Sequence, residues 1–581
     1  MSDAVEMGEV RVTVHRDGDD LLSAGLGLAG LRAPPPAFGN ADAPAAAELR
    51  RRAIHSSWRG IADLGPLGGY AEIYGAVPIV AGREYATLAS LPRQRASHRV
   101  LVQVPDLFDR QKRCLVVTAS SGSRGIYGAI SLAGAWGLTR GCAVAYTDKG
   151  AGSGYFDVDT DTGVALDGTR AAQENDLEFV GDVAGAAGEV QVKHAHSGVN
   201  PEADWGRHVL QAARIGLRML DDAFPSEAPF TAQNTRVIAT GLSNGGGAVL
   251  QAAGLDDGLI DGVVALEPNV LAGEGRALYD YVTEAAVYAT CALLDARFDE
   301  VPFARIGGQP PPAWLARCAA LRTRGLLTAA TPATQAAEAL AKLHASGWTD
   351  AVLASAASST ALDLWRSVAV TYAAAYARTG TQSMPCGYAF VNVDASGRRE
   401  PGSPAARAAW WSDASGIPPG AGVGIADAMG EGADAALPGL LCLRDLWSGR
   451  GAIADRLRAG VAATRATLPR ASLPIVVIHG MEDGLIPPDF SSGPYARWLA
   501  DNGRTLSHWR VAHAQHFDAF LAFPGFGERY VPMLPYAYAA LDHLWSHISA
   551  GSALPPSAVI ATTPRGDGPL GAIQLGSIPG D

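Results

Sequence analysis

The chain has 581 residues, of which 48% are hydrophobic and 18% are charged. This apolar fraction supports a sizeable core, so general disorder is excluded, and the length indicates one large elaborated domain or two. No continuous apolar stretch is long enough to form a transmembrane helix. The net charge of -12 and the lack of a basic block argue against a nucleic-acid partner.

Predicted strands and helices alternate along much of the chain. The first strands are expected at Glu9–His15 and His98–Val104, and the apolar run Arg113–Ser120 predicts a buried strand before a Gly-rich loop and a helix. Asp204 is expected to cap a long amphipathic helix. Later strands are predicted at Gly141–Gly150, Thr235–Thr240, Ile260–Leu266, Pro474–Gly480 and Leu506–Ala512. This alternation predicts a mostly parallel sheet with helices on both faces.

The stretch from residue 271 to residue 468 interrupts the alternation. It is rich in Ala and helical in pattern, so we expect an inserted lid over the carboxyl edge of the sheet, where open α/β sheets bind ligands. The expected organisation is an N-terminal extension (1–95), a core in two parts (96–270 and 469–550) separated by the lid (271–468), and a Pro/Gly-rich tail (551–581).

The sharpest motif is VIATGLSNGGGAVL (Val237–Leu250), which contains Gly-x-Ser-x-Gly as Gly241, Ser243 and Gly245. It follows a predicted strand and precedes a predicted helix, which is the context that a nucleophile elbow requires. A tight turn there projects the Ser hydroxyl, and small neighbours let the backbone approach closely. The alternative is a Gly-rich turn that serves packing alone. We interpret Ser243 as the nucleophile of an α/β-hydrolase-like fold with a large, mainly helical inserted lid.

A nucleophilic serine needs a base, and the base needs an orienting acid. In α/β-hydrolases the acid and then the histidine follow the serine along the chain. Asp483 comes just after the predicted strand that ends at Gly480, and His516 lies in the loop after the last core strand, next to Phe517. We therefore expect Asp483 and His516 to complete a triad. Glu482 and Asp489 are the alternative candidates for the acid, and His513 is the alternative candidate for the base.

An oxyanion hole needs two preorganised backbone N–H groups. One is expected from Asn244, directly after the nucleophile, and the other from the loop TASSGSRGIYG (Thr118–Gly128), for which Ser121 or a neighbour is the candidate. A Gly-rich turn without a catalytic role predicts the same string nearly as well.

The chain contains six cysteines, and none forms a Cys-x-x-Cys pair, so zinc or thioredoxin-like chemistry is not indicated. Cys114 and Cys142 lie in apolar runs and are expected to be buried small hydrophobic residues. The other four allow either two disulfides in an oxidising compartment or four free thiols; they are Cys291, Cys318, Cys386 and Cys442.

Longer strings give a specific resemblance. SNGGGA, SGSRGIYGAI, GCAVAYTDKG, KHAHSGVNPEADWG (Lys193–Gly206) and QHFDAFLAFPGF resemble the D-(-)-3-hydroxybutyrate oligomer hydrolases. The similarity runs from about Leu21 to Arg565, with Ala514 where the family pattern has Gly. A more distant similarity is to lidded tannase-like and feruloyl esterase-like hydrolases.

The resemblance implies a serine esterase that hydrolyses 3-hydroxybutyrate dimers and short oligomers, with Ser243 as the nucleophile. An esterase for aromatic or tannin-like esters is the alternative, and a binding protein that has lost catalysis would lack a triad member. No metal or redox cofactor is required, and the expected partner is a small-molecule ester, not nucleic acid or a membrane. The N-terminal residues MSDAVEMGEVRV have no basic or apolar leader segment, which predicts a cytoplasmic protein, with secretion or periplasmic export after loss of a leader as the alternative.

Each 3-hydroxybutyrate oligomer ends in a carboxylate, which a chain with a net charge of -12 repels at long range. Binding therefore requires a local cation, and a guanidinium group can hold a carboxylate through two hydrogen bonds. Arg124, in the presumed oxyanion loop, is the first candidate, and Lys149, at the end of the next strand, is the second. The alternative is that Arg124 pairs with a structural acid.

Overall fold

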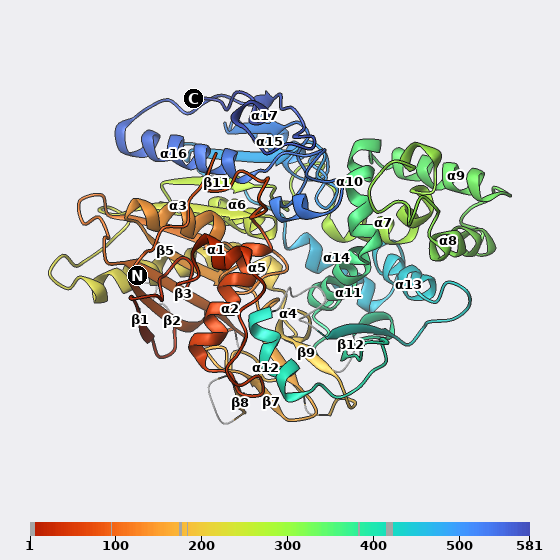
Figure 1. The fold of residues 1–581 in the computed structure, drawn as a ribbon, viewed down its shortest axis with the longest axis horizontal. Coiled ribbons are helices and arrows are strands. Elements are labelled where there is room, and N and C mark those ends of the chain that lie inside the picture. Colours follow the sequence, from red (N-terminus) through yellow and green to blue (C-terminus); the bar gives the residue numbers. More distant parts are fainter. Residues whose placement is uncertain are drawn as a thin grey trace.

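A sheet of ten strands forms the centre of the fold in the computed structural model, which describes residues 6–94, 96–173, 177–182, 184–381, 384–413 and 422–580. The strand order is β1-β2-β3-β5-β4-β10-β11-β14-β15-β16 (Figure 1). All neighbours from β5 to β16 are parallel, whereas β1, β2 and β3 pair antiparallel. The strands are β1 (Arg11–His15), β2 (Gly82–Ser90), β3 (Ser97–Pro105), β4 (Cys114–Ala119), β5 (Ala143–Asp148), β10 (Arg236–Leu242), β11 (Gly262–Leu266), β14 (Ile475–Gly480), β15 (Ser507–Val511) and β16 (Ala558–Ile560).

Helices cover both faces of this sheet. Successive strand residues point to opposite faces, so apolar side chains on both faces need to be buried. Val237 and Ala239 of β10 join the core under one set of helices, and Ile238 joins the core under another. The first set is α5 (Pro201–Ala223), α6 (Asn244–Leu255) and α15 (Ser492–Asp501), and the second includes α1 (Gly27–Arg32), α2 (Ala46–Arg59), α3 (Ala135–Gly137) and α16 (Leu534–Ala550). The predicted α/β-hydrolase-like architecture is confirmed.

The long helix α5 begins earlier than the sequence predicts. The residue at its N-cap is Asn200, whose side chain accepts a hydrogen bond from Ala203 N–H (3.4 Å), and Pro201 takes the first helical position. Proline suits that position because its missing N–H would be unpaired in any case. The prediction of Asp204 as the N-cap is therefore wrong, and Asp204 lies inside the first turn.

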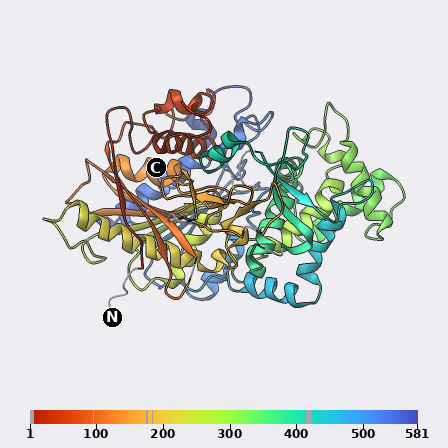
Figure 2. The same cartoon turned by 90° about the horizontal axis from the view of Figure 1, so that it is seen from below.

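A mainly helical insertion separates β11 from β14. Figures 1 and 2 show most of it gathered beside the sheet, in green and cyan. Its elements are α7 (Leu278–Ala292), α8 (Pro312–Thr323), α9 (Pro332–Ala345), α10 (Asp350–Ala361), α11 (Leu364–Ala377), β12 (Tyr388–Asn392), α12 (Pro404–Asp413), β13 (Val423–Asp427), α13 (Leu437–Ser448) and α14 (Ala452–Ala462). The insertion is thus the lid that the sequence predicts, with one antiparallel hairpin formed by β12 and β13.

Both ends of the chain contribute to the main sheet. β1 and β2 come from the first 95 residues and β16 from the last 31, as the sheet order shows. A second, smaller sheet has the strand order β8-β7-β6-β9 and is followed by helix α4 (Lys193–His196). Its strands are β6 (Tyr155–Asp157), β7 (Thr162–Val164), β8 (Arg170–Ala172) and β9 (Val190–Val192). The last helix of the chain is α17 (Ala572–Leu575). Within the described residues, none of the helices is long and apolar enough to span a membrane.

All six cysteines are paired. The pairs are Cys114–Cys142, Cys291–Cys318 and Cys386–Cys442. Cys114 and Cys142 are buried, as expected, but they are also bonded to each other, which the sequence pattern does not predict. β4 and β5 pair in parallel with Leu115 opposite Ala143, which brings the two preceding cysteines together. The other two disulfides lie within the lid.

The Cys386–Cys442 disulfide closes a loop with a sequence separation of 56 residues. Restricting the unfolded chain over such a loop stabilises a fold by about 4 kcal/mol in the chain-entropy model. We expect the Cys386→Ser, Cys442→Ser double variant to unfold at a lower temperature than the wild type in a calorimetric scan. Denatured, unreduced protein should contain no titratable thiols, and detection of free thiols there would contradict the pairing.

Candidate active site

Ser243 occupies a strained turn between β10 and α6. Its backbone angles are φ 59° and ψ -126°, which residues with a side chain rarely adopt and which functional sites often retain. The Ser243 N–H donates to Leu266 O of the neighbouring strand (2.9 Å). Gly245 is required because a methyl group on its Cα would lie 2.2 Å from Ala119 O. The turn therefore places the Ser243 hydroxyl at the carboxyl end of the central strand.

Asp483 and His516 come from the loops that follow strands β14 and β15, which lie beyond β11 in the sheet. Ser243 Oγ lies 2.9 Å from His516 Nε2, and His516 Nδ1 lies 2.7 Å from Asp483 Oδ2. The ionised carboxylate only accepts hydrogen bonds, so Nδ1 carries the ring proton and Nε2 is free to accept from the serine hydroxyl. The Phe517 ring packs against the His516 ring, with 4.2 Å between centroids. The three side chains form one continuous hydrogen-bonded chain.

Asp483 is fully buried and is stabilised in its charged form. Its Oδ1 accepts hydrogen bonds from the N–H groups of Leu485 and Ile486, both at 2.8 Å. His479, on β14, places Nε2 at 2.9 Å from Ile486 O and 3.2 Å from Asp483 Oδ2, so this nitrogen carries a proton and donates. Burial alone would raise the pKa of Asp483, but His516 and His479 outweigh it and hold this pKa well below its ordinary value.

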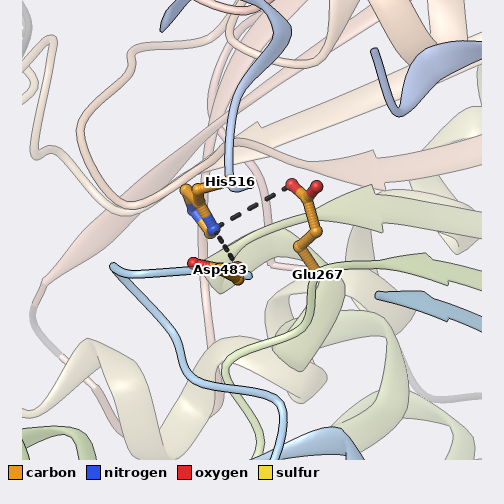
Figure 3. Close-up of side chains that lie close together, drawn as sticks. All are labelled: Glu267, Asp483 and His516. Atoms are coloured by element: carbon orange, nitrogen blue, oxygen red, sulfur yellow. Dashed lines mark hydrogen bonds and ion pairs between the residues drawn. The ribbon is translucent and has the colours of Figure 1, made fainter. Parts of the chain in front are cut away.

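A second carboxyl group, that of Glu267, lies beside the same histidine. Glu267 follows β11 in a positive-φ conformation (48°), and its Oε2 is 3.9 Å from His516 Nδ1. Figure 3 shows the Asp483 and Glu267 carboxyl groups next to the same ring nitrogen. Burial raises the pKa of Glu267 well above its ordinary value, and the nearby charges of Asp483 and Asp518 raise it further. Burial and these two charges thus favour the neutral form of Glu267 over its charged form.

These three groups are also close enough to share a cation. The ligand atoms of Glu267, Asp483 and His516 lie within 4.8 Å of one another. Both ring nitrogens of His516 already have partners, Ser243 Oγ and Asp483 Oδ2. The hydrogen-bonded chain thus uses both ring nitrogens of His516, and Glu267 lies beside this chain, outside it.

The loop after β4 faces the nucleophile. Ser120 N–H donates to Thr147 O (3.0 Å) and Arg124 N–H donates to Ser121 O (3.2 Å), so these two amides are used within the fold. Ser121 is fully buried, whereas Gly122 lines the cavity in front of Ser243. A methyl group on Gly122 would lie 2.1 Å from Asn244 Oδ1. The backbone of this loop thus lies directly against the residue that follows the nucleophile.

The Asn244 side chain is held by a buried polar network. Its Oδ1 accepts from the Tyr372 hydroxyl of lid helix α11 (2.6 Å), and its Nδ2 donates to Glu202 Oε2 (3.2 Å). Lys149 donates to the Tyr372 hydroxyl (2.9 Å) and pairs with Glu202. Burial alone would raise the pKa of Glu202, but Lys149 and His194 outweigh it and lower this pKa to about 2. The network fixes the elbow to the lid.

A cavity of about 290 Å³ opens in front of Ser243. This volume is at the small end of ligand cavities. Its lining is mostly apolar and comes from the oxyanion loop, the elbow, the lid and the loops of the acid and the base: Gly122, Ser123, Arg124, Ser243, Asn244, Leu278, Leu362, Leu364, Val368, Tyr372, Leu485, Ile486, Phe517 and Phe520. The lining thus combines apolar side chains with a basic residue, Arg124.

The sequence of almost the whole chain matches one family of known proteins. Residues 3–580 match the profile of the 3HB-oligomer hydrolase (3HBOH) family. The chain belongs to this family. It is 40% identical to the D-(-)-3-hydroxybutyrate oligomer hydrolase of Paracidovorax citrulli (strain AAC00-1), in an alignment that covers 97% of this chain and 90% of that relative. With the enzyme of the same name from Ralstonia pickettii the identity is 38%, covering 96% and 84%.

Solved structures that align with most of this chain share little sequence identity with it. Feruloyl esterase B from Aspergillus oryzae aligns with 99% of this chain and 92% of its own, at 11% identity and a TM-score of 0.40. The tannin acyl hydrolase from Aspergillus niger aligns with 95% and 85%, at 12% identity and a TM-score of 0.40.

The structure brings together Ser243, Asp483 and His516 and leaves their competitors outside the hydrogen-bonded chain. Asp489 is exposed and Glu482 is only half-buried. His513 directs Nδ1 to Thr562 O at 3.1 Å instead. Lys149, the second candidate for the substrate carboxylate, is bound to Glu202 and is 1% exposed; it is not among the residues that line the cavity.

Sequence reasoning did not identify several residues of the site. Glu267 follows a predicted strand directly, and that position at the carboxyl edge is the signal that would have singled it out. His479 is the next-to-last residue of a predicted strand, where it resembles any buried core histidine. Tyr372 lies on a lid helix far from the motifs. Glu202 lies within the string Lys193–Gly206, where sequence reasoning gives it no role. Only the tertiary packing brings both side chains to Asn244.

The two histidines of the β15 loop should differ sharply. His516→Ala removes the base that accepts the serine proton, so we expect kcat to fall on the order of 10⁵-fold or more, as for other triad histidines. His513→Ala should leave kcat within a few-fold of the wild type because the His513 ring is directed to Thr562 and not to Ser243 or Asp483. Steady-state kinetics with a chromogenic short-chain ester measures both, and the reverse ranking would refute the role of His516.

The two carboxyl groups beside His516 should also differ. Asp483→Asn should lower kcat on the order of 10⁴-fold because the amide cannot orient the imidazole in the required tautomer. Glu267→Gln should keep activity within a few-fold, since Glu267 lies outside the hydrogen-bonded chain from Ser243 to Asp483 and its neutral form is the favoured one. A group with a raised pKa in the folded state loses its stabilising effect as pH rises. Glu267→Gln should therefore raise Tm more at about pH 8 than at about pH 5.

In this pair of variants, Glu267→Gln is the matched control for Asp483→Asn, because both exchange a buried carboxyl group for its amide beside the same imidazole. A loss of activity in Glu267→Gln as large as that in Asp483→Asn would show that the two acids share the role.

Proposed function

We propose that this chain is a serine esterase that hydrolyses dimers and short oligomers of D-(-)-3-hydroxybutyrate to the monomer through an acyl-enzyme. The observation that carries this proposal is the hydrogen-bonded chain from Ser243 through His516 to Asp483 at the wall of the apolar cavity. Membership of the 3HB-oligomer hydrolase family and relatives that carry the name D-(-)-3-hydroxybutyrate oligomer hydrolase support the substrate class.

In the first half of the reaction Ser243 Oγ attacks the ester carbonyl carbon while His516 Nε2 takes the hydroxyl proton. The imidazolium that forms is stabilised by the Asp483 carboxylate at 2.7 Å. When the tetrahedral intermediate collapses, the bond to the leaving oxygen breaks and His516 returns the proton to that oxygen. The leaving group departs as a hydroxy acid, and Ser243 carries the acyl group.

In the second half a water molecule gives a proton to His516 and attacks the acyl carbon. The bond to Ser243 Oγ breaks, His516 reprotonates that oxygen, and the second hydroxy acid leaves. In both halves the negative charge on the carbonyl oxygen is stabilised by backbone N–H groups. Asn244 N–H at the start of α6 supplies one, and Gly122 is a better candidate than Ser121 for the other because it lines the cavity.

The cavity supports a small ester with methyl branches. Side chains such as Leu364, Val368 and Leu485 surround the nucleophile, and a 3-hydroxybutyryl unit presents a methyl group and a methylene group to them. A volume of about 290 Å³ favours short oligomers over a solid polymer. The three disulfides favour an oxidising compartment over the cytosol, and the thiol titration described above tests the pairing on which this rests.

One set of experiments tests both the identity of the nucleophile and the class of substrate. Ser243→Ala should fold like the wild type and lose hydrolysis of the 3-hydroxybutyrate dimer by up to about 10⁶-fold. A fluorophosphonate probe should label Ser243 in the wild type, as located by peptide mass spectrometry. The wild type should hydrolyse the dimer with a much higher kcat/KM than methyl ferulate or methyl gallate.

Two results would contradict the proposal. Labelling at another serine, with Ser243→Ala still active, would remove Ser243 as the nucleophile. Faster hydrolysis of the aromatic esters would keep the esterase mechanism but replace the substrate class.

A further inference from the structure

We propose that Arg124 binds the free carboxylate at the end of the substrate and thereby directs cleavage to the ester bond nearest that carboxylate. The inference rests on the proposed function and adds to it a specificity-determining residue and a direction of attack. Its structural basis is an arginine without a carboxylate partner in the wall of the active-site cavity.

Arg124 lies in the oxyanion loop and lines the same cavity as Ser243 and Asn244. Its side chain is half-buried, so part of it is accessible from that cavity. The guanidinium group passes over Gly60, where a methyl group would lie 2.0 Å from it. Its Nη1 reaches Ser56 O at 3.4 Å, and its Nε is buried without a partner.

The charge of Arg124 is not compensated by an acid in the described part of the chain. Its pKa is lowered to about 10 by burial, which still leaves it cationic at neutral pH. Several other enclosed guanidinium groups are paired with acids, among them Arg50 with Glu84, Arg99 with Glu178 and Arg317 with Asp434. An enclosed charge without a partner is costly, so the Arg124 site favours an anionic ligand.

The rest of the cavity lining leaves the carboxylate one place to bind. Among the described lining residues Arg124 is the cation, and none is an Asp or Glu. Lys149, the other basic residue considered for this role, is neutralised by Glu202 and is enclosed in the Asn244 network. A substrate carboxylate that enters this apolar space therefore meets its counter-charge at Arg124, which can offer two parallel N–H donors.

Because of the covalent structure of the oligomer, this contact determines which ester bond is cleaved. In a 3-hydroxybutyrate oligomer, four covalent bonds separate the terminal carboxylate carbon from the nearest ester carbonyl carbon. An arginine that shares a small cavity with Ser243 can bind the carboxylate while that carbonyl reaches the nucleophile. The terminal unit then leaves first, as free 3-hydroxybutyrate, and the rest of the chain remains on Ser243. Longer oligomers lose one monomer at a time from the carboxyl end.

The test compares the free-acid trimer of 3-hydroxybutyrate with its carboxyl methyl ester, and with a trimer acetylated at the hydroxyl end. For the wild type, kcat/KM should fall at least about 10-fold on methylation, as expected for the loss of a charge-assisted hydrogen bond, and change little on acetylation. Arg124→Met should lower kcat/KM for the free acid by a similar factor and hardly change it for the methyl ester. Arg124→Lys should retain part of the preference.

Arg32→Met is the matched control variant. Arg32 is also half-buried and donates to backbone carbonyls, those of Leu64 and Tyr70, but it is not among the residues that line the cavity. It should leave the ratio of the two kcat/KM values unchanged. Equal losses on acid and methyl ester in Arg124→Met would show that Arg124 acts on the fold or on the scissile carbonyl, and would overturn the proposal.

The wild-type rates on the free acid and on its methyl ester test the proposal even if Arg124→Met does not fold. Equal rates for the free acid and its methyl ester would overturn the carboxylate contact while leaving the esterase function intact. Failure of the wild type to hydrolyse any of the three trimers would instead refute the proposed function. Release of dimer before monomer from the free-acid trimer would contradict cleavage at the bond nearest the carboxylate.

Discussion

The hydrogen bond between Ser243 and His516 depends on one geometric constraint, which is that parallel strands end at the same edge of a sheet. β10, β11, β14 and β15 are consecutive neighbours in the sheet, and their following residues include Ser243, Glu267, Asp483 and His516. Residues up to 273 positions apart in the chain, Ser243 and His516, therefore come within 2.9 Å. The strained turn at Ser243 persists because glycine neighbours leave room for the surrounding backbone.

Electrostatics then assigns different states to two acids beside one imidazole. Asp483 has two backbone N–H donors and two histidine neighbours, and these stabilise its charge against burial. Glu267 lies beside the same imidazole, 3.9 Å from His516 Nδ1, but in the described part of the chain it accepts no backbone N–H, and one of its oxygens is buried without a partner. Burial and the Asp483 charge raise the pKa of Glu267, whereas His516 and His479 lower that of Asp483 against the effect of burial. The hydrogen-bonded acid is therefore the one whose charge the site stabilises.

The lid determines what the edge of the sheet can bind. Helix α11 brings Tyr372 to the elbow, where it fixes the side chain of Asn244 and closes the cavity on one side. The resulting space is small and mostly apolar, so a charged group in its wall acts at a lower effective dielectric than at the surface. Arg124 is such a group, and its selectivity for an anion is the proposal that follows from this environment.

The sequence by itself determined the local features: the elbow around Ser243, the buried strands, the helical insertion, and the chain order in which Asp483 and His516 follow the nucleophile. These depend on short patterns and on the periodicity of apolar residues, which are local properties. Only the tertiary structure decided the N-cap of α5, the Cys114–Cys142 pair, the raised pKa of Glu267, His479 behind Asp483 and the network from Glu202 to Tyr372. Each depends on which distant residues pack together and on how deeply they are buried, and a pKa or a pairing is set by that environment and not by neighbours in the chain.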